Sequence, residues 1–255
     1  MIAEDTPDRT VLRLTGADRH AFLQGLVTND LKSLDTGLVY TALLSPQGKY
    51  LADFFLAAEP EAILLDVKSS MAEALVRRLA LYRLRADVAI TATRLHVQRG
   101  LGPPPPGGFA DPRDPALGWR RFAKEGGGAP DIDWDAIRVA HTIPESGIEL
   151  IADETYILEA GFERLNGVDF RKGCYVGQEV TARMKHKTDL RKGLAQVRVT
   201  GTAPVGTEIT AKDKPVGTLF TQSGGHAIAY LRFDRAAGDM QAGTARVFPL
   251  DADRQ

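Results

Sequence analysis

The N-terminal third of the chain alternates between apolar runs and stretches with helical periodicity. Five apolar runs of strand length lie at residues 11–14, 39–44, 50–57, 63–67 and 88–92. Between them, apolar residues recur three and four positions apart over 18–26 and again over 69–82, which predicts two helices, the first with Thr15 and Asp18 as candidate capping residues. The order β-α-β-β-β-α-β is typical of a ferredoxin-like unit with its helices on one face of a mixed sheet.

From Leu194 onward the pattern changes to short apolar stretches separated by glycines. Strands are predicted near 194–199, 207–210, 215–221, 226–233 and 245–249. Short strands with frequent turn signals are typical of a small antiparallel barrel. Two stretches rich in glycine and proline, 102–108 and 126–130, can neither bury a face nor extend a sheet, so they are predicted to be loops. The chain is therefore expected to have an α+β fold that ends in a small β-barrel.

Charge and composition exclude several classes of function. The formal net charge is −1, so no global field attracts the protein to nucleic acid or to an anionic membrane. No apolar run approaches the roughly 20 residues that a membrane helix needs, and residues 1–15 contain no apolar segment of a secretory signal. The single cysteine, Cys174, fits a reducing compartment. We therefore expect a cytoplasmic protein.

The small number of cysteines also limits metal binding. A cluster or structural zinc held by this chain alone would need several cysteines or cysteine–histidine pairs. The chain has one cysteine and five scattered histidines without ligand spacing. No resident metal site is expected, and any link to iron–sulfur proteins would be that of a helper.

The most informative segment is residues 172–179, with the sequence KGCYVGQE. Glycines on both sides of Cys174 allow a tight turn or the close approach of a ligand. Lys172 and Arg171 would favour the thiolate and lower the pKa of the thiol, whereas Gln178 and Glu179 are predicted to begin a helix. From these residues alone two interpretations stay open: Cys174 is a reactive thiol, or it is a small buried hydrophobe between turn glycines.

This segment resembles the K-G-C-Y-x-G-Q-E signature of the YgfZ family of folate-binding proteins. Residues 21–30, with the sequence AFLQGLVTND, resemble the N-terminal helix of that family and its T-N-D element. Residues 44–53 resemble the next block, and Arg138 and the Glu159-Ala160-Gly161 step look like counterparts in the aminomethyltransferase superfamily. The resemblance spans about residues 10 to 195, and the C-terminal barrel agrees in its strand pattern.

The resemblance implies a tetrahydrofolate-binding protein with two ferredoxin-like lobes over residues 1–190 and a β-barrel over 191–255. In that family the cysteine motif is linked to assembly or repair of [4Fe–4S] enzymes, including radical enzymes that modify tRNA. Carried over to this chain, Cys174 and Lys172 would be the catalytic pair. Related aminomethyltransferases have two aspartates after the glycine turn, where this chain has Ala52 and Asp53. That difference argues against ordinary aminomethyl transfer.

A folate site makes three chemical demands. The pterin edge needs a carboxylate, the aminobenzoyl ring an apolar or aromatic wall, and the glutamate tail a basic mouth. Tyr175 and Phe170 are candidates for the wall, and a basic stretch from Arg183 through Lys185, Lys187 and Arg191 to Lys192 is the candidate mouth. The predicted folate-binding residues are Asp53, Glu159, Tyr175, Gln178, Glu179 and Arg183.

Each assignment has a structural alternative. The two glutamates equally fit capping or pairing on a solvated face, and the tyrosine equally fits a core position. The basic stretch equally fits a solvated hairpin or loop, or a surface for an acidic partner. It contains no aromatic residues for base stacking, which disfavours nucleic acid.

Three functions therefore stay open. The first is a folate-binding accessory factor that meets iron–sulfur client proteins transiently, as a monomer without membrane attachment. The second is a folate-dependent one-carbon transferase or demethylase. The third is a folate-binding scaffold with a structural cysteine.

Overall fold

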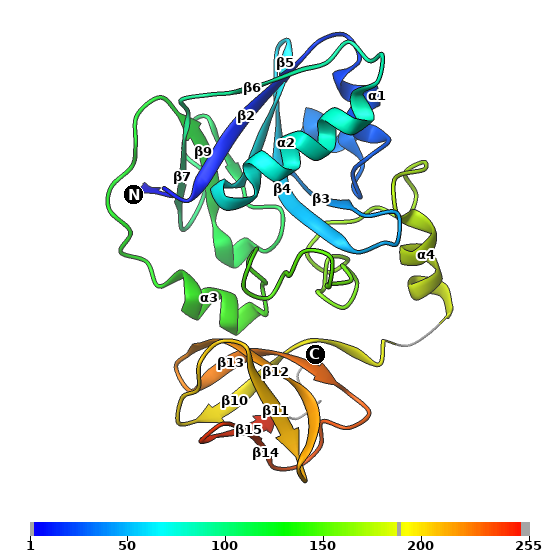
Figure 1. Cartoon of the computed structure of the whole chain (residues 1–255). Helices are drawn as coiled ribbons and strands as arrows, with labels where there is room; N and C mark the ends of the chain where they lie inside the picture. Colours follow the sequence, from blue (N-terminus) through cyan, green and yellow to red (C-terminus); the bar gives the residue numbers. More distant parts are fainter. Residues whose placement is uncertain (1–2, 188–189, 251–255) are drawn as a thin grey trace. The chain divides into compact units, whose positions relative to one another are not determined.

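The computed structural model describes residues 3–187 and 190–250, with the side chain of Lys187 outside the described part (Figure 1). The chain forms two compact units, and each consists of two segments. The first unit contains Met1–Ile132 and Phe162–Val180, and the second contains Asp133–Gly161 and Thr181–Gln255. The division into domains 1–190 and 191–255 stays a prediction.

A five-stranded sheet forms the centre of the first unit. Its strands are β2 (Arg9–Thr15), β3 (Val39–Leu44), β4 (Tyr50–Glu59), β5 (Ala62–Lys68) and β6 (Ala89–Ala92), in the order β3-β4-β5-β2-β6. All neighbouring pairs are antiparallel, so the expectation of a mixed sheet is wrong. The reason is that β3, β4 and β5 follow one another through short turns, which can join only antiparallel strands.

Two α-helices and a 3-10 helix cover one face of this sheet. They are α1 (Arg19–Gln24), η1 (Leu31–Asp35) and α2 (Ser69–Arg83), and Figure 1 shows α2 lying across the sheet. Leu23, Leu75 and Leu79 pack into a single core with the apolar residues of the strands. Asp18 stands before α1 without capping it, because its carboxylate accepts a hydrogen bond from the backbone N–H of Asp87 instead.

A second sheet of the first unit was not predicted. Its strands are β1 (Glu4–Asp5), β7 (His96–Gly100), β8 (Gly108–Ala110) and β9 (Trp119–Ala123), in the order β1-β7-β9-β8, with η2 (Pro115–Leu117) before β9. These strands are short and carry several charged residues, so they lack the apolar runs by which the other strands are recognised.

Buried ion pairs connect the two sheets of the first unit. Asp66 on β5 accepts from Arg9 at 2.6 Å and from Arg120 on β9 at 3.2 Å. Arg120 also contacts Asp111 at 3.0 Å, and Asp111 pairs with Arg113 at 2.9 Å. The chain of alternating charges leaves each buried carboxylate with at least two cationic contacts, as burial of charge requires.

Asp111 should make the first unit sensitive to acid. Burial alone would raise the pKa of Asp111, but Arg113 and Arg120 outweigh burial and lower it to about 2 from a reference value of 3.8. Because the folded pKa is depressed, this stabilisation is complete above pH 4 and is lost as the pH falls through 2. We expect the free energy of unfolding to fall by roughly 2 kcal/mol from this group. Urea titrations of wild type and Asp111→Asn from pH 2 to 7 would measure it.

The matched control is Glu73→Gln, which removes an exposed carboxylate paired with Arg77. This change should shift stability by less than about 1 kcal/mol at any pH. An Asp111→Asn protein with wild-type stability at pH 7 would contradict the assigned role.

The second unit contains α3 (Trp134–His141), most of α4 (Gln178–Lys187) and a closed antiparallel barrel. The barrel strands are β10 (Lys192–Thr200), β11 (Thr207–Ala211), β12 (Lys214–Ser223), β13 (His226–Arg232), β14 (Met240–Ala242) and β15 (Ala245–Pro249), in the order β10-β13-β12-β11-β14-β15. The α+β fold class and the five predicted barrel strands are confirmed. Only the short β14 was not predicted, because three residues carry too little periodicity.

Candidate functional site

The loop before α4 exposes the single cysteine between two buried residues. Lys172 and Tyr175 are 5% and 7% exposed, whereas Gly173 and Cys174 between them are exposed. The interpretation of Cys174 as a small buried hydrophobe is therefore wrong. The thiol lies where a partner molecule can reach it, as reactive cysteines must.

The side chain of Lys172 is buried at the start of this loop. Its ammonium donates hydrogen bonds to the backbone carbonyls of Gln24, at 2.7 Å, and Val27, and lies 5.1 Å from the centre of the Tyr175 ring. Burial lowers the pKa of Lys172 to about 8, against the smaller upward effects of Asp30 and Asp169. These contacts of the ammonium hold the loop, and its predicted effect on the thiol of Cys174 stays a prediction.

Two glycines pack the motif against the turn between β3 and β4. Gly177 has a φ of +83° and Gly48 a φ of +75°, both in the left-handed region. A Cβ on Gly177 would lie 2.6 Å from the carbonyl oxygen of Ser45, and one on Gly48 would lie 2.8 Å from the Cβ of Val180. The glycines of the two sequence blocks that resemble the YgfZ family therefore meet in one backbone contact.

Asp53 is buried on β4 with two hydroxyl partners. Its carboxylate accepts from Tyr50 at 2.6 Å and from Tyr40 at 3.0 Å, and the residue is 3% exposed. The pKa of the Tyr40 hydroxyl is raised well above its usual value, mainly by burial and then by the charge of Asp53. A carboxylate buried in an apolar run needs hydrogen-bond partners, and these tyrosines provide them. Its predicted contact with folate stays a prediction.

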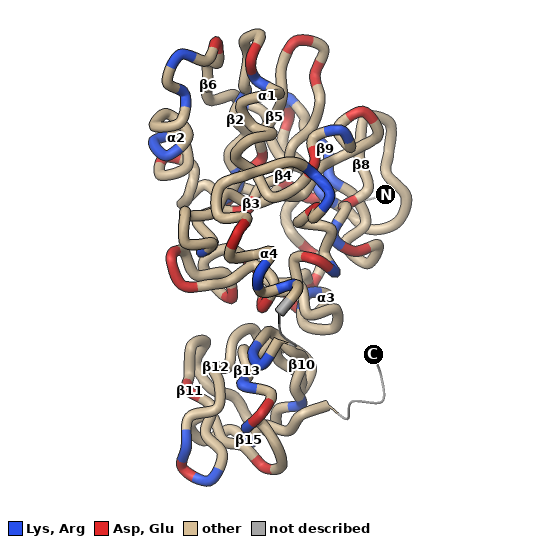
Figure 2. The backbone as a smooth tube through the Cα atoms, turned by 90° about the vertical axis from the view of Figure 1, so that its right-hand side faces the viewer, with Lys and Arg blue, Asp and Glu red and all other residues tan. Residues whose placement is uncertain are grey.

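The remaining predicted folate ligands lie in different surroundings. Gln178 and Glu179 begin α4 as predicted, with Glu179 exposed. In the second unit, Glu159 accepts a hydrogen bond from Tyr230 at 2.7 Å; burial and then this carboxylate raise the pKa of the tyrosine. Arg183 is exposed on α4, and Figure 2 shows basic residues along this helix. The first part of the basic stretch is helical, not a hairpin, and its member Lys187 has a side chain outside the described residues.

Arg138 in the second unit is buried in a network of its own. It donates to Glu149 at 2.9 Å and to the Thr221 hydroxyl at 2.8 Å, so it joins α3 to strand β12. The pKa of Arg138 is raised: burial lowers it, but Glu149 and neighbouring carboxylates outweigh burial. These contacts indicate that Arg138 stabilises the second unit.

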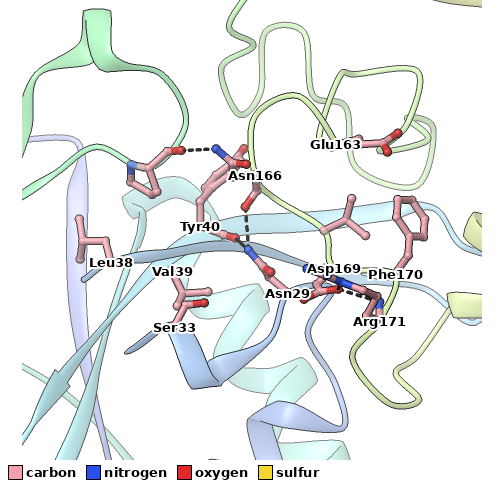
Figure 3. Close-up of a pocket in the computed structure, with 12 residues that line it drawn as sticks. Asn29, Ser33, Leu38, Val39, Tyr40, Glu163, Asn166, Asp169, Phe170 and Arg171 are labelled. Carbon is pink, nitrogen blue, oxygen red and sulfur yellow. Dashed lines mark hydrogen bonds and ion pairs between the residues drawn. The ribbon is translucent and has the colours of Figure 1, made fainter. Parts of the chain in front are cut away.

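A cavity of about 580 Å³ opens in the first unit, close to the cysteine loop in sequence (Figure 3). A ligand pocket of this volume suits a molecule of cofactor size. Its wall combines apolar and aromatic residues with two carboxylates, two amides and one arginine. The lining residues are Asn29, Ser33, Leu38, Val39, Tyr40, Pro112, Glu163, Asn166, Val168, Asp169, Phe170 and Arg171.

Hydrogen bonds hold the wall of this cavity in place. The Asn29 side chain donates to the carbonyls of Tyr40, at 2.9 Å, and Asn166, at 2.7 Å, and Asn166 in turn donates to Pro112 at 2.9 Å (Figure 3). Asn166 has a φ of +53°, a conformation that asparagine tolerates better than most residues. Of the lining residues, the sequence predicts Phe170 as an aromatic wall for folate and Arg171 as a group that favours the thiolate, and Asn29 belongs to the T-N-D element.

Within residues 3–187 and 190–250, no group of three or more His, Cys, Asp and Glu side chains is placed to hold a metal ion. No helix in this part of the chain combines the length and apolar character needed to cross a bilayer.

Comparison with known proteins adds independent information. Residues 191–253 match the family described as "CAF17, C-terminal beta-barrel domain". The chain is 31% identical to "Iron-sulfur cluster assembly factor IBA57, mitochondrial" of Homo sapiens, covering 91% of this chain and 78% of that protein. The Mus musculus protein of the same name is 30% identical, covering 93% and 79%. The homolog from Mycosarcoma maydis is 32% identical over 78% of this chain, which spans only 58% of that protein.

The fold has a relative among solved structures. The crystal structure of glycine cleavage system aminomethyltransferase T from Bartonella henselae superposes with a TM-score of 0.74, covering 96% of this chain and 83% of that one. The sequence identity is 14%, so this likeness shows the fold alone.

Proposed function

Because the chain belongs to the IBA57/CAF17 family, the YgfZ-type relatives of aminomethyltransferases that include iron–sulfur cluster assembly factors, we propose that it is a tetrahydrofolate-binding accessory factor for assembly or repair of iron–sulfur enzymes. The observation that carries this proposal is the exposed Cys174 at the tip of the KGCYVGQE loop. A thiolate is a soft ligand for iron, so an exposed cysteine suits transient contact with a cluster that is cargo.

The cavity of the first unit supports the folate part of the proposal. Asp169 and Glu163 supply carboxylates for the pterin edge, Phe170 supplies an aromatic wall, and Arg171 supplies a cation for the glutamate tail. The Arg171 side chain is 95% exposed, as a group that receives an anionic tail at the rim would be. Folate bound there would supply one-carbon chemistry, whereas these residues would bind and orient it.

The other functions have less support. The fold likeness to an aminomethyltransferase carries no activity at 14% identity, and Ala52 stands where those enzymes have the first of two acidic residues. The exposure of Cys174 argues against a purely structural cysteine. We include [4Fe–4S] enzymes that modify tRNA among the proposed clients, on the resemblance of the motif.

The boundary between the two domains and the cellular location of the protein are also part of the proposal. The barrel match begins at residue 191, which supports a folate-binding region over 1–190 followed by a barrel domain. The relatives carry "mitochondrial" in their names, and a cytoplasmic location for this chain stays a prediction, as does the monomeric state.

Titration with tetrahydrofolate tests the folate site. We expect saturable binding by calorimetry, weakened about tenfold to a hundredfold in Asp169→Asn, because a charge-assisted hydrogen bond to the pterin is lost. Asp53→Asn is the matched variant, since it makes the same single change at a candidate carboxylate that does not line the cavity. Weakening by Asp53→Asn alone would move the pterin from the cavity to Asp53. Absence of binding to the wild-type protein would contradict a folate function.

A further inference from the structure

Two segments of the first unit, residues 24–29 and 166–172, lie side by side, and the second leads along the chain from the cavity wall to Cys174. At the cavity end, Asn29 donates to the carbonyl of Asn166 at 2.7 Å. Next, the Thr28 hydroxyl donates to the carbonyl of Gly167 at 2.7 Å, and the Asp169 N–H donates to the carbonyl of Thr28 at 3.1 Å. The two segments are thus bonded along their length, and both contribute to the cavity wall.

Lys172 makes the last connection in this series, next to the cysteine. Its ammonium donates hydrogen bonds to the carbonyls of Gln24 and Val27. Gln24 is the final residue of α1, whose C-terminal carbonyls lack partners within the helix and attract cations. The face of the Tyr175 ring adds a contact at 5.1 Å. The positive charge is therefore held by three groups, two of them on the 24–29 segment.

The tip of the loop has little packing of its own. A Cβ placed on Gly173 would meet nothing within 4 Å, and Cys174 is exposed. The place of the thiol is therefore set by the buried residues on each side of the tip. Of these, Lys172 reaches the 24–29 segment through hydrogen bonds to the carbonyls of Gln24 and Val27.

We propose that Lys172 is a positioning residue, which fixes Cys174 relative to the cavity wall through its hydrogen bonds to the 24–29 segment. The inference deepens the proposed function, on which it rests, by specifying how the thiol is presented to a cluster-bearing client. The role differs from activation of the thiol, because it acts through the geometry of the loop. A thiol held at a fixed place can meet a partner at lower entropic cost than one on a loose loop.

The single cysteine permits a direct test without further engineering. A nitroxide spin label attached to the full chain reacts at Cys174 alone. In the wild-type protein we expect a motionally restricted electron paramagnetic resonance component, and in Lys172→Met we expect its loss. Amide exchange of residues 172–177 should become at least about tenfold faster, because two hydrogen bonds from a charged group are lost. An unchanged spectrum with unchanged exchange would overturn the proposal.

The matched control is Leu75→Ala, which opens a cavity in the core of the same unit. Leu75 is far in sequence from Lys172 and from the 24–29 segment. This variant should lose stability and keep the restricted spectrum. Equal loosening in both variants would show that Lys172 acts only through general stability, which would overturn the positioning role. If Lys172→Met melts below the assay temperature, Lys172→Gln, a shorter neutral side chain, carries the same expectation.

A cellular comparison separates this inference from the proposed function. Lys172→Met should lower the activity of iron–sulfur enzymes in cells that depend on the variant, and Leu75→Ala at matched protein level should not. Loss with Cys174→Ser but full activity with Lys172→Met would overturn the positioning role and leave the proposed function standing. Full activity with Cys174→Ser would instead remove the proposed function.

Discussion

Replacing Cys174 by serine should abolish support of iron–sulfur enzymes in cells and leave the fold intact. The residue is exposed, so the exchange of sulfur for oxygen removes no packing, and the free energy of unfolding should change by less than about 0.5 kcal/mol. A serine hydroxyl stays protonated at neutral pH and is a poor ligand for iron, whereas a thiolate binds it well. The measurement is the activity of [4Fe–4S] enzymes in a deletion strain that expresses each variant.

The expected activity of the serine variant is that of the deletion strain, at a protein level equal to wild type. Cys174→Ala should give the same loss, because it also lacks the thiolate. A variant that supports the client enzymes as well as wild type would favour the scaffold hypothesis. A variant that fails to accumulate would point to a structural cysteine, and its thermal unfolding would show this directly.

The elements of the first sheet and of the barrel could be predicted because their signals are local. The runs at 39–44 and 63–67 are buried strands, and the turn at 45–48 joins the first of them, β3, to β4. Residues 18–26 and 69–82 hold helices because apolar residues at helical spacing share a face, and their leucines do enter one core. The barrel strands are predicted by short apolar stretches between glycine-marked turns.

The second sheet of the first unit could not be found in this way. Trp119 and Arg120 on β9 are both buried, but Arg120 is tolerated there only because Asp66 and Asp111 lie against it. Asp66 precedes Arg120 by 54 residues, and no local pattern announces such a pairing. A buried arginine in an isolated sequence is indistinguishable from a solvated one.

The candidate site likewise has a part that local sequence predicts and a part that depends on contacts distant in sequence. The motif around Cys174 could be selected from its residues, and the position of Asp53 indicated that it needs partners. Neither pattern revealed that Tyr40 and Tyr50 are those partners. The cavity wall depends on Asn29 and residues 166–171, which meet through bonds between side chains and backbone across 137 residues of sequence. Periodicity carries no information on contacts of this kind.

Replacing Gly177 by alanine should destabilise the first unit by about 3 to 5 kcal/mol. Two costs add. A φ of +83° is strained for any residue with a Cβ, and the new methyl group would lie 2.6 Å from the Ser45 carbonyl oxygen and 3.0 Å from the Leu44 side chain. Backbone atoms cannot move aside as a flexible side chain would, so the loop and the β3–β4 turn must separate. Chemical denaturation followed by circular dichroism measures the loss.

Gly173→Ala is the matched control, because it makes the same chemical change four residues earlier in the same motif. A Cβ there meets nothing within 4 Å, so the stability should change by less than about 0.5 kcal/mol. The pair of variants therefore separates two roles of glycine in KGCYVGQE. Gly177 lets two backbones touch inside the fold, whereas any requirement for Gly173 must come from a molecule that approaches Cys174 from outside. Equal destabilisation by both substitutions would contradict this distinction, and a stable Gly173→Ala protein that no longer supports iron–sulfur enzymes would locate the partner at the exposed tip.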